Sequence, residues 1–328
     1  MRFMHELLYL FTIILILTTA NTQSADAAIR ADSGFTSILI IASYDEYTDF
    51  KAPSSLAVNG KSGRMCIVDK DPDEVYLMSM QGLPIKRIGG EAGAKSSAGA
   101  AIANDGSIYI TDAETASIKV VSPDESKMVI AMPAVEGGKA PVPGRMVIDR
   151  NGNLYVTDKA NSRICVFDRD GNVKFQFGKS GVKHGEFKSL EDVAVDRLGR
   201  IYAADSSGTP VQVFDKKGKY LYRFGFRGEG DEDISFAAGL FIDPNDQVWV
   251  VDRGAHSLKV FDRNGTFLRK FGEYGTEQGE LFQPVDAEMD SLGRIYVLEA
   301  GAKRLQIFML RRSFERFTPS EDRNAVVD

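Results

Sequence analysis

The sequence contains few of the residues that build covalent or metal-centred sites. Its 328 residues include two cysteines, three histidines and one tryptophan. Two cysteines cannot form a disulfide framework, and Cys66 and Cys165 both lie in apolar runs, where a free thiol acts as a small buried hydrophobe. Three histidines leave little material for His-based catalysis or for a zinc site with several histidine ligands.

An excess of positive charge is also absent. Lys and Arg number 40 against 46 Asp and Glu, which gives a net charge of −6 and a pI of about 5.3. No global positive field exists to gather nucleic acid, so we expect no nucleic-acid partner. The fractions of charged residues, 26%, and hydrophobic residues, 43%, are typical of a soluble globular protein.

The one long apolar run lies within residues 1–28. A basic start, MRFMHE, precedes the run from Leu7 to Leu17, and an Ala-x-Ala site stands at 25–27. This order is that of a secretory signal peptide, and the run is shorter than the roughly 20 residues that span a bilayer. An uncleaved N-terminal membrane anchor is the alternative. Either reading predicts a periplasmic or extracellular protein, which we expect to be monomeric and to touch the membrane only through such an anchor.

A short aromatic or apolar run that ends in an acid occurs six times. Successive acids are 43, 46, 47, 47 and 47 residues apart. Each copy holds four short segments rich in β-branched and aromatic residues, which predict strands; in the third copy they are 144–149, 154–158, 163–168 and 173–178. The six acids are Asp69, Asp112, Asp158, Asp205, Asp252 and Glu299.

The turns between these strands have their own signature, Asp-x-x-Gly, as at 149–152 and 168–171. The Asp accepts hydrogen bonds from nearby backbone, and the Gly takes a positive φ. Such tight turns make consecutive strands antiparallel neighbours. Four antiparallel strands per repeat, repeated six times, predict an all-β fold, the six-bladed β-propeller.

The repeats divide the chain into four parts. Residues 1–28 are the signal or anchor, 29–50 hold an N-terminal strand that closes the ring, 51–317 form the propeller, and 318–328 form a flexible tail. The strand FTSILIIASY (35–44) has no blade of its own, and the sixth copy ends in a weak fourth strand at 311–317. We expect the N-terminal strand to pair with this last blade.

The repeat resembles the NHL repeat through its pattern of turn Asp and Gly, Ile-Tyr-Val-x-Asp, Arg-Ile-x-Val-Phe-Asp and Phe-Gly. Copies three to six, residues 141–317, match well; the first two depart through a longer loop at 59–63 and a missing turn Gly at 122–126. The resemblance implies a propeller of the exported bacterial type. NHL propellers serve as binding platforms, as parts of ubiquitin ligases and as amidating lyases, so the resemblance leaves the activity open.

The repeated acid is better explained by structure than by catalysis. A catalytic acid is needed once, whereas this one recurs in every copy, so we predict that it accepts hydrogen bonds from N–H groups of the adjacent loop. Two histidines of the mature chain, His184 and His256, lie in different blades and do not match the several-histidine zinc site that the amidating lyases carry.

Calcium has two candidate places. The run Asp69-Lys-Asp71-Pro-Asp73 resembles the start of an EF-hand, but Glu74 and Met80 stand where that loop needs Gly and Glu. A weak surface calcium site remains an alternative to a solvated acidic loop. Lactonase-type propellers hold calcium in the channel with carboxylates and Asn, whereas here the only Asn near the inner strands, Asn59 and Asn104, are in turns.

The innermost strands line the central channel, and one position there varies between copies. The NHL repeat commonly has Gly at this position. Three copies instead carry Arg145, Asp192 and Asp286, and Glu191 and Glu288 lie nearby in the sequence. We predict a polar cluster of these three at one channel mouth that binds a ligand, ion or partner; the alternative is a hydrated structural network. The six copies read Ser55, Gly99, Arg145, Asp192, Gly239 and Asp286.

Basic side chains recur in the loops between second and third strands, on one face of the ring. We predict that they bind an acidic protein segment or an anionic glycan, because binding residues concentrate on loops of rigid scaffolds; ordinary solvated loops are the alternative. These residues are Lys159, Arg163, Arg253, His256, Lys303 and Arg304.

The sequence therefore favours an exported, non-enzymatic platform for a protein or glycan partner, with no catalytic residue and no cofactor. The alternative is a propeller hydrolase or lyase, similar to the lactonases or amidating lyases, with a metal ion such as Ca²⁺ in the central channel.

Overall fold

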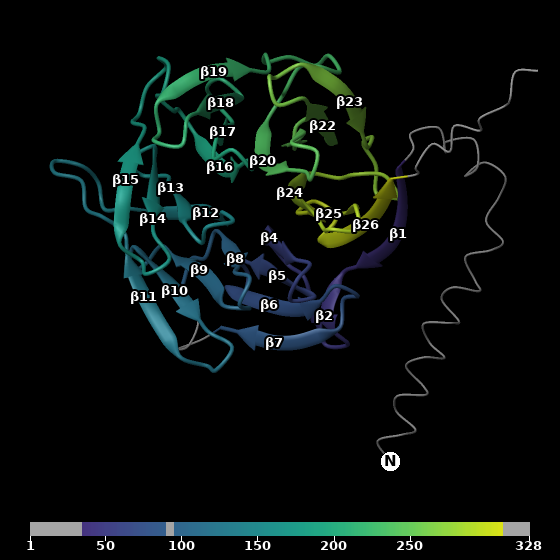
Figure 1. Ribbon diagram of the computed structural model, residues 1–328. Helices are drawn as coiled ribbons and strands as arrows, with labels where there is room; N and C mark the ends of the chain where they lie inside the picture. Colours follow the sequence, from purple (N-terminus) through teal and green to yellow (C-terminus); the bar gives the residue numbers. More distant parts are fainter. Residues whose placement is uncertain (1–34, 90–94, 311–328) are drawn as a thin grey trace, which may run out of the picture. The chain divides into compact units, whose positions relative to one another are not determined.

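Six four-stranded sheets surround a central channel in the computed structural model (Figure 1). The structure describes residues 35–89 and 95–310. Contacts place Ser37–Leu310 in one compact unit, and of the second unit, formed by the two chain ends, only Phe35 and Thr36 are described. The predicted six-bladed, all-β propeller is confirmed.

Each blade runs from an inner strand at the channel to an outer strand at the rim, and its consecutive strands are antiparallel. Blades 1 to 3 contain β4 (Pro53–Asn59), β5 (Arg64–Asp69), β6 (Glu74–Ser79) and β7 (Pro84–Ile88); β8 (Ala100–Ile102), β9 (Ile108–Asp112), β10 (Ser117–Val121) and β11 (Lys127–Ala131); β12 (Pro143–Ile148), β13 (Leu154–Asp158), β14 (Arg163–Phe167) and β15 (Val173–Phe177). Blades 4 to 6 contain β16 (Leu190–Val195), β17 (Ile201–Asp205), β18 (Val211–Phe214) and β19 (Tyr220–Phe224); β20 (Ala237–Ile242), β21 (Val248–Asp252), β22 (Ser257–Phe261) and β23 (Phe267–Phe271); β24 (Pro284–Met289), β25 (Arg294–Glu299), β26 (Arg304–Leu310) and β1 (Phe35–Ile41).

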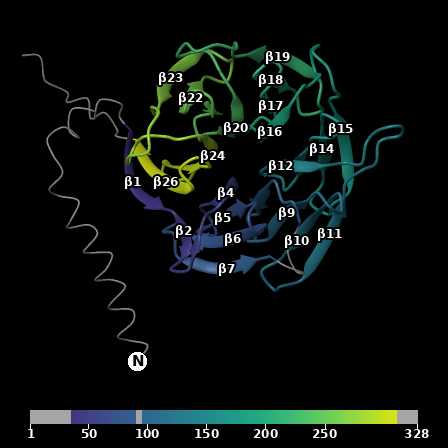
Figure 2. The ribbon, with the colours of Figure 1, turned by 180° about the vertical axis from the view of Figure 1, so that it is seen from behind.

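The ring is continuous around the channel, as Figure 2 shows from behind. The inner strands contact one another in the cyclic order β4, β8, β12, β16, β20, β24 and back to β4. Apolar clusters fill the space between blades 1 and 2, 2 and 3, 3 and 4, 4 and 5, and 6 and 1, so that blades 1 to 4 bury both faces against their neighbours. Cys66 and Cys165 lie in two of these clusters, and burial raises the pKa of each thiol to about 12.

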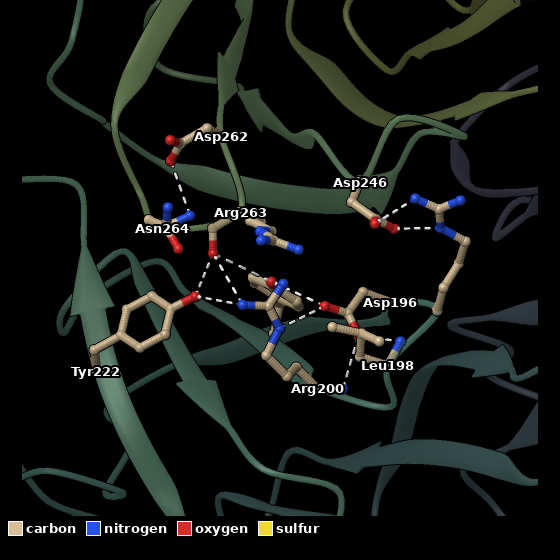
Figure 3. A network of polar contacts seen from close by, with 10 residues as sticks. Asp196, Leu198, Arg200, Tyr222, Asp246, Asp262, Arg263 and Asn264 are labelled. Carbon is tan, nitrogen blue, oxygen red and sulfur yellow. Dashed lines mark hydrogen bonds and ion pairs between the residues drawn. The ribbon is translucent and has the colours of Figure 1, made fainter.

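The turn between the first and second strands forms a small polar unit, shown for blade 4 in Figure 3. Asp196 accepts backbone N–H groups from Leu198 at 2.9 Å and Arg200 at 2.8 Å, and the Tyr202 hydroxyl donates to it at 3.3 Å. The turn Asp and the aromatic residue of the second strand are therefore joined by a hydrogen bond that stabilises the turn. The same contact joins Tyr155 to Asp149 at 3.3 Å, Trp249 to Asp243 at 3.1 Å and Tyr296 to Asp290 at 3.2 Å.

Polar contacts also connect the turns of neighbouring blades. Arg197 of blade 4 donates from Nε to Asp246 of blade 5 at 2.8 Å. The backbone carbonyl of Arg263 in blade 5 accepts hydrogen bonds from the side chains of Tyr222 and Arg200 in blade 4 (Figure 3). The face that carries these turns, which we call the turn face, is thus held together by contacts within the protein.

The N-terminal strand β1 is the outer strand of the sixth blade, beside β26. After it, a small hairpin of β2 (Ser43–Asp45) and β3 (Thr48–Asp49) leads towards blade 1. Ile41, Tyr44 and Phe50 join an apolar cluster shared by blades 1 and 6, and Tyr44 stacks on Tyr76 with ring centroids 5.0 Å apart. The first and sixth blades are therefore joined through this N-terminal segment.

Three further expectations concern residues that the structure does not describe: the segment 1–28, the weak strand at 311–317 and the tail at 318–328. Within the described ranges, no helix is long and apolar enough to cross a membrane.

A chain that begins at residue 42 should unfold at a lower temperature than one that begins at residue 35, because it lacks β1. About 1 kcal/mol shifts the Tm of a domain of this size by roughly 2–4 °C, so loss of a whole strand should lower it by at least about 5 °C. Differential scanning calorimetry measures the difference. Equal Tm values for the two chains would show that β1 does not hold the ring closed.

Candidate functional site

The predicted channel residues lie at a shared irregularity of the inner strands. In five blades the pairing between the first and second strands shifts register near its start, at Pro53/Ser55, Pro143/Met146, Leu190/Asp192, Ala237/Gly239 and Pro284/Asp286. A bulge re-aims the side chain that it carries. The position that varies between copies therefore lies at the bulge, where the direction of the side chain departs from the regular alternation of the strand.

Arg145 reaches from the inner strand of blade 3 to residues of blades 4, 6 and 1. Its Nη1 lies 2.8 Å from Asp286 Oδ1 and 3.5 Å from Asp192 Oδ2. Its Nη2 donates to the backbone carbonyls of Ser54 at 2.7 Å and Val285 at 2.6 Å. The structure thus brings Arg145, Asp192 and Asp286 together, and the arginine ties three other blades to its own.

Both aspartates also hold the backbone. Asp192 accepts the N–H of Leu240 in blade 5 at 2.8 Å, and Asp286 accepts the N–H of Leu56 in blade 1 at 2.7 Å. Each also accepts the N–H of the residue that follows it, at 2.8 Å and 2.9 Å respectively. The three side chains are buried, with exposed fractions of 5–9%. The polar atoms of Arg145, Asp192 and Asp286, which were predicted to bind a ligand, thus make contacts within the protein, as the alternative of a structural network would have it.

Gly239 provides the room for this network. A Cβ at this position would lie 3.0 Å from Arg145 Nη1 and 3.3 Å from Asp286 Oδ1. Gly99 has a different constraint, since a Cβ there would lie 2.7 Å from the carbonyl oxygen of Gly144 in the next blade. The glycines at this position therefore permit close approach of inner strands or of the arginine.

The electrostatic balance of the channel is unusual. Three carboxylates, Asp192, Asp286 and Glu288, share one guanidinium. Burial raises the pKa of Asp192 to about 7, against the lowering effect of Arg145, and it raises the pKa of Asp286 as well. The pKa of Glu288 is raised well above its usual value, first by burial and then by the two aspartates.

Glu288 faces open space inside the channel. It lines a cavity of about 100 Å³ beside Arg145 and a second of about 220 Å³ that is bounded by the inner strands of blades 1 to 3. The residue is half-buried. Among residues 35–89 and 95–310, no group of three or more His, Cys, Asp or Glu side chains is placed to hold a metal ion.

The repeated acid at the end of the second strand is structural, as predicted. Asp252 accepts the N–H groups of Ser235 at 2.8 Å, Phe236 at 2.9 Å and Ala255 at 3.1 Å. All six acids are at most 1% exposed. Hydrogen bonds from the segment before the inner strand also join Asp69 to the N–H of Ala52, Asp158 to Val142, Asp205 to Ser189 and Glu299 to Phe282. Asp112 instead accepts the N–H of Thr115, in the loop after its own strand.

Two of the six predicted loop-face residues are not at the surface. Arg163 is 4% exposed and its Nε lies 2.8 Å from Asp158; Arg304 is 8% exposed and its Nε lies 2.7 Å from Glu299. Arg163 also donates to the backbone carbonyl of Pro133 and to the side chain of Gln176, and Arg304 donates to the carbonyl of Thr276. The expectation that these two present a free charge on the loop face is wrong, because each is buried and paired with the repeated acid of its own blade.

The other four loop residues have different surroundings. His256 accepts the backbone N–H of Gln283 at Nδ1, 3.0 Å away, and its ring packs against Phe282 and Tyr274. Arg253 donates to the Gln283 side chain at 3.1 Å. Lys159 pairs with Glu191 at 2.7 Å, and Lys303 is exposed.

One ring of equivalent positions surrounds the channel mouth on this loop face. The residue that directly follows each repeated acid donates its backbone N–H, at 2.9–3.1 Å, to a carbonyl that precedes the inner strand of the same blade. We call these six positions the mouth ring. In blade order they are Lys70, Ala113, Lys159, Ser206, Arg253 and Ala300, so that basic and small residues alternate.

Glu191 places a carboxylate within the mouth ring. Its Oε2 lies 2.7 Å from Lys159 Nζ, and its Oε1 accepts the Ser206 hydroxyl at 2.8 Å. Burial raises the pKa of Glu191, but Lys159, Ser206 and Arg145 outweigh this effect and hold it below its usual value. The sequence showed Lys159, Arg253 and Glu191 as separate features; comparing the residue after each acid would have revealed the alternation and added Lys70.

Comparisons with known proteins agree on the fold. A family model, DUF5128, described as a 6-bladed beta-propeller, matches residues 145–207. No curated protein matches the chain in sequence.

Solved propellers are similar in structure at low sequence identity. A protein of unknown function from Bacteroides thetaiotaomicron has a TM-score of 0.64 at 16% identity, over 80% of this chain and 70% of that one. Virginiamycin B lyase from Staphylococcus aureus has a TM-score of 0.61 at 12% identity, over 84% and 99%. A gluconolactonase from Xanthomonas campestris has a TM-score of 0.60 at 13% identity, over 80% and 86%. At such identities the likeness shows the fold alone.

Glu288→Gln should stabilise the protein at alkaline pH. Ionisation of Glu288 costs more in the folded than in the unfolded chain, so its contribution to stability falls as pH rises from about 4.3, the unfolded value, towards the raised folded value. The amide removes this loss. Urea unfolding should therefore show a larger gain in the free energy of unfolding at pH 8 than at pH 5.

The exposed Glu229→Gln serves as the control and should change little at either pH. A Glu288→Gln variant that is no more stable than the wild type at pH 8 would contradict the account of the channel.

Proposed function

We propose that this chain is an exported, non-enzymatic binding platform that engages a protein partner through its loop face around the channel mouth. The observation that carries the proposal is the mouth ring. Six equivalent backbone hydrogen bonds fix its positions, while the side chains differ from blade to blade. Structural constraint explains what the six blades share, and recognition by a partner accounts for the blade-specific charges.

The contacts in the channel favour binding over catalysis. Asp192 and Asp286, the carboxylates that a hydrolase or lyase would use, each accept two backbone N–H groups and share Arg145. A general base must reach the proton that it removes, and these two are committed to holding neighbouring inner strands. In the mouth ring, by contrast, Lys70 and Lys159 are exposed and Arg253 is half-buried, so a partner can reach these charges.

Sequence supports the remaining parts of the proposal. The basic, apolar and small-residue order of residues 1–28 favours export, with cleavage or anchoring as the two outcomes. The resemblance to NHL repeats fits a platform, since such propellers bind partners through one face. An anionic glycan is the other partner class that the basic loop face would suit.

A photo-crosslinking residue at Lys303 tests the proposal against a matched position, Leu292. Both lie in blade 6 and are exposed, but Lys303 is on the loop face and Leu292 is in a turn on the opposite face. In the cells that make the protein, the Lys303 position should give a defined adduct that the Leu292 position does not. Mass spectrometry then identifies the partner, and the purified pair should bind again in solution.

Adducts from both positions alike, or from neither, would overturn the loop-face proposal. Metal analysis of the purified protein tests the alternative that the chain is an enzyme with a metal ion in its channel. One equivalent of calcium or zinc per chain, lost in an Asp192→Asn/Asp286→Asn variant, would favour a propeller hydrolase or lyase instead.

A further inference from the structure

We infer that the mouth ring is a recognition site for an acidic tip of a peptide, whose carboxylates dock on Lys70 and Arg253 and compete with Glu191 for Lys159. This inference rests on the proposed function and deepens it by naming the chemistry of the ligand. It is carried by the placement of three cations at equivalent positions on alternate blades, each fixed by the same backbone hydrogen bond.

The cations lie close enough to act on one another. Burial lowers the pKa of the Lys70 ammonium, and Lys159, Arg145 and Arg253 lower it further, whereas Glu191 raises it. The positive charges of Lys159, Arg145 and Arg253 thus all disfavour the charged form of Lys70. Like charges gathered at one place favour an anion between them, and the partly desolvated setting at the channel strengthens that attraction relative to open water.

Glu191 shows that a carboxylate fits this ring. It bridges an ammonium and a hydroxyl, Lys159 and Ser206, at 2.7 Å and 2.8 Å. The equivalent positions of the other five blades carry Ser54, Ala98, Gly144, Ala238 and Val285, none of them acidic. One of the three ring cations therefore has an internal carboxylate, while Arg253 contacts only the neutral amide oxygen of Gln283 among the contacts recorded in residues 35–89 and 95–310.

The surroundings of the ring favour a localised anion over a long polyanion. The basic groups encircle one axis instead of forming a stripe along which evenly spaced charges could lie. Acidic residues occur on the connections at this end of the blades: Asp71 follows Lys70 in blade 1, and Glu229 and Glu273 lie in the loops that lead to blades 5 and 6. A polysaccharide lying across the face would meet these acids, whereas a peptide loop or end with one or two acidic residues would not.

The test uses the purified full chain and a labelled peptide, GSGEEGSG, with GSGQQGSG as its matched control. Fluorescence anisotropy at low salt should show binding of the Glu peptide and markedly weaker binding of the Gln peptide. Lys70→Ala and Arg253→Ala should each weaken binding about twofold to fivefold, the range of exposed ion pairs. Lys183→Ala, an exposed lysine of the loop into blade 4 and away from the ring, should leave binding unchanged.

Glu191→Gln gives the sharpest readout. If Glu191 competes with the ligand, its amide variant should bind the Glu peptide more tightly than the wild type does, while a merely structural Glu191 would give equal or weaker binding. Added salt should weaken binding to every variant, because it screens exposed charges.

Equal binding of the Glu and Gln peptides would overturn the inference, as would an equal loss in Lys183→Ala and Lys70→Ala. Tighter binding of tetragalacturonate than of the Glu peptide would show that the site prefers an anionic glycan, and would overturn the inference of a peptide ligand. Failure of this inference is distinguishable from failure of the proposed function. If a partner still crosslinks at position 303 in the Lys70→Ala/Arg253→Ala variant, the binding-platform proposal stands and the acidic-tip site is excluded.

Discussion

The structure depends on the buried acid at the end of the second strand of each blade. In five blades its carboxylate accepts N–H groups from the connection into the inner strand, as Asp252 does from Ser235 and Phe236, whereas Asp112 of blade 2 accepts the N–H of Thr115 in the loop that follows it. In blade 5 a buried lysine, Lys259, completes the charge balance at 3.1 Å and also donates to loop carbonyls, among them that of Gly230. Removing one partner of such a pair would leave the other buried and unpaired, which costs about 3–5 kcal/mol.

This constraint determines where side chains can vary. Beside the acid, two positions recur around the channel: the bulge of the inner strand, which is present in five blades, and the mouth-ring residue after the acid, whose backbone hydrogen bond is present in all six. At the bulge, Arg145, Asp192 and Asp286 make contacts within the protein that join blades. At the ring, Lys70 is exposed and Arg253 is half-buried, and these are the charges that we propose for recognition.

Much of this could be predicted from sequence because the signals are local and repeated. The period, the Asp-x-x-Gly turns and the alternating strands predicted six antiparallel blades, and in blade 3 the observed strands agree with those expected to within one residue. Which of the basic side chains are exposed could not be predicted from these local, repeated signals. Arg163 and Lys159 are four residues apart, yet only the former is buried, because the direction of a side chain beside a buried acid is decided by partners such as Gln176 and Pro133, which lie elsewhere in the chain.

The central claim, that the repeated acid holds the loop face in place, is most directly tested by hydrogen exchange in Asp252→Asn. The amide cannot accept the same set of bonds with full charge, so the N–H groups of Ser235, Phe236 and Ala255 should exchange faster in the variant. Protection in blade 3, where Asp158 is untouched, should stay the same. Unchanged protection of those three amides in the folded variant would contradict the account.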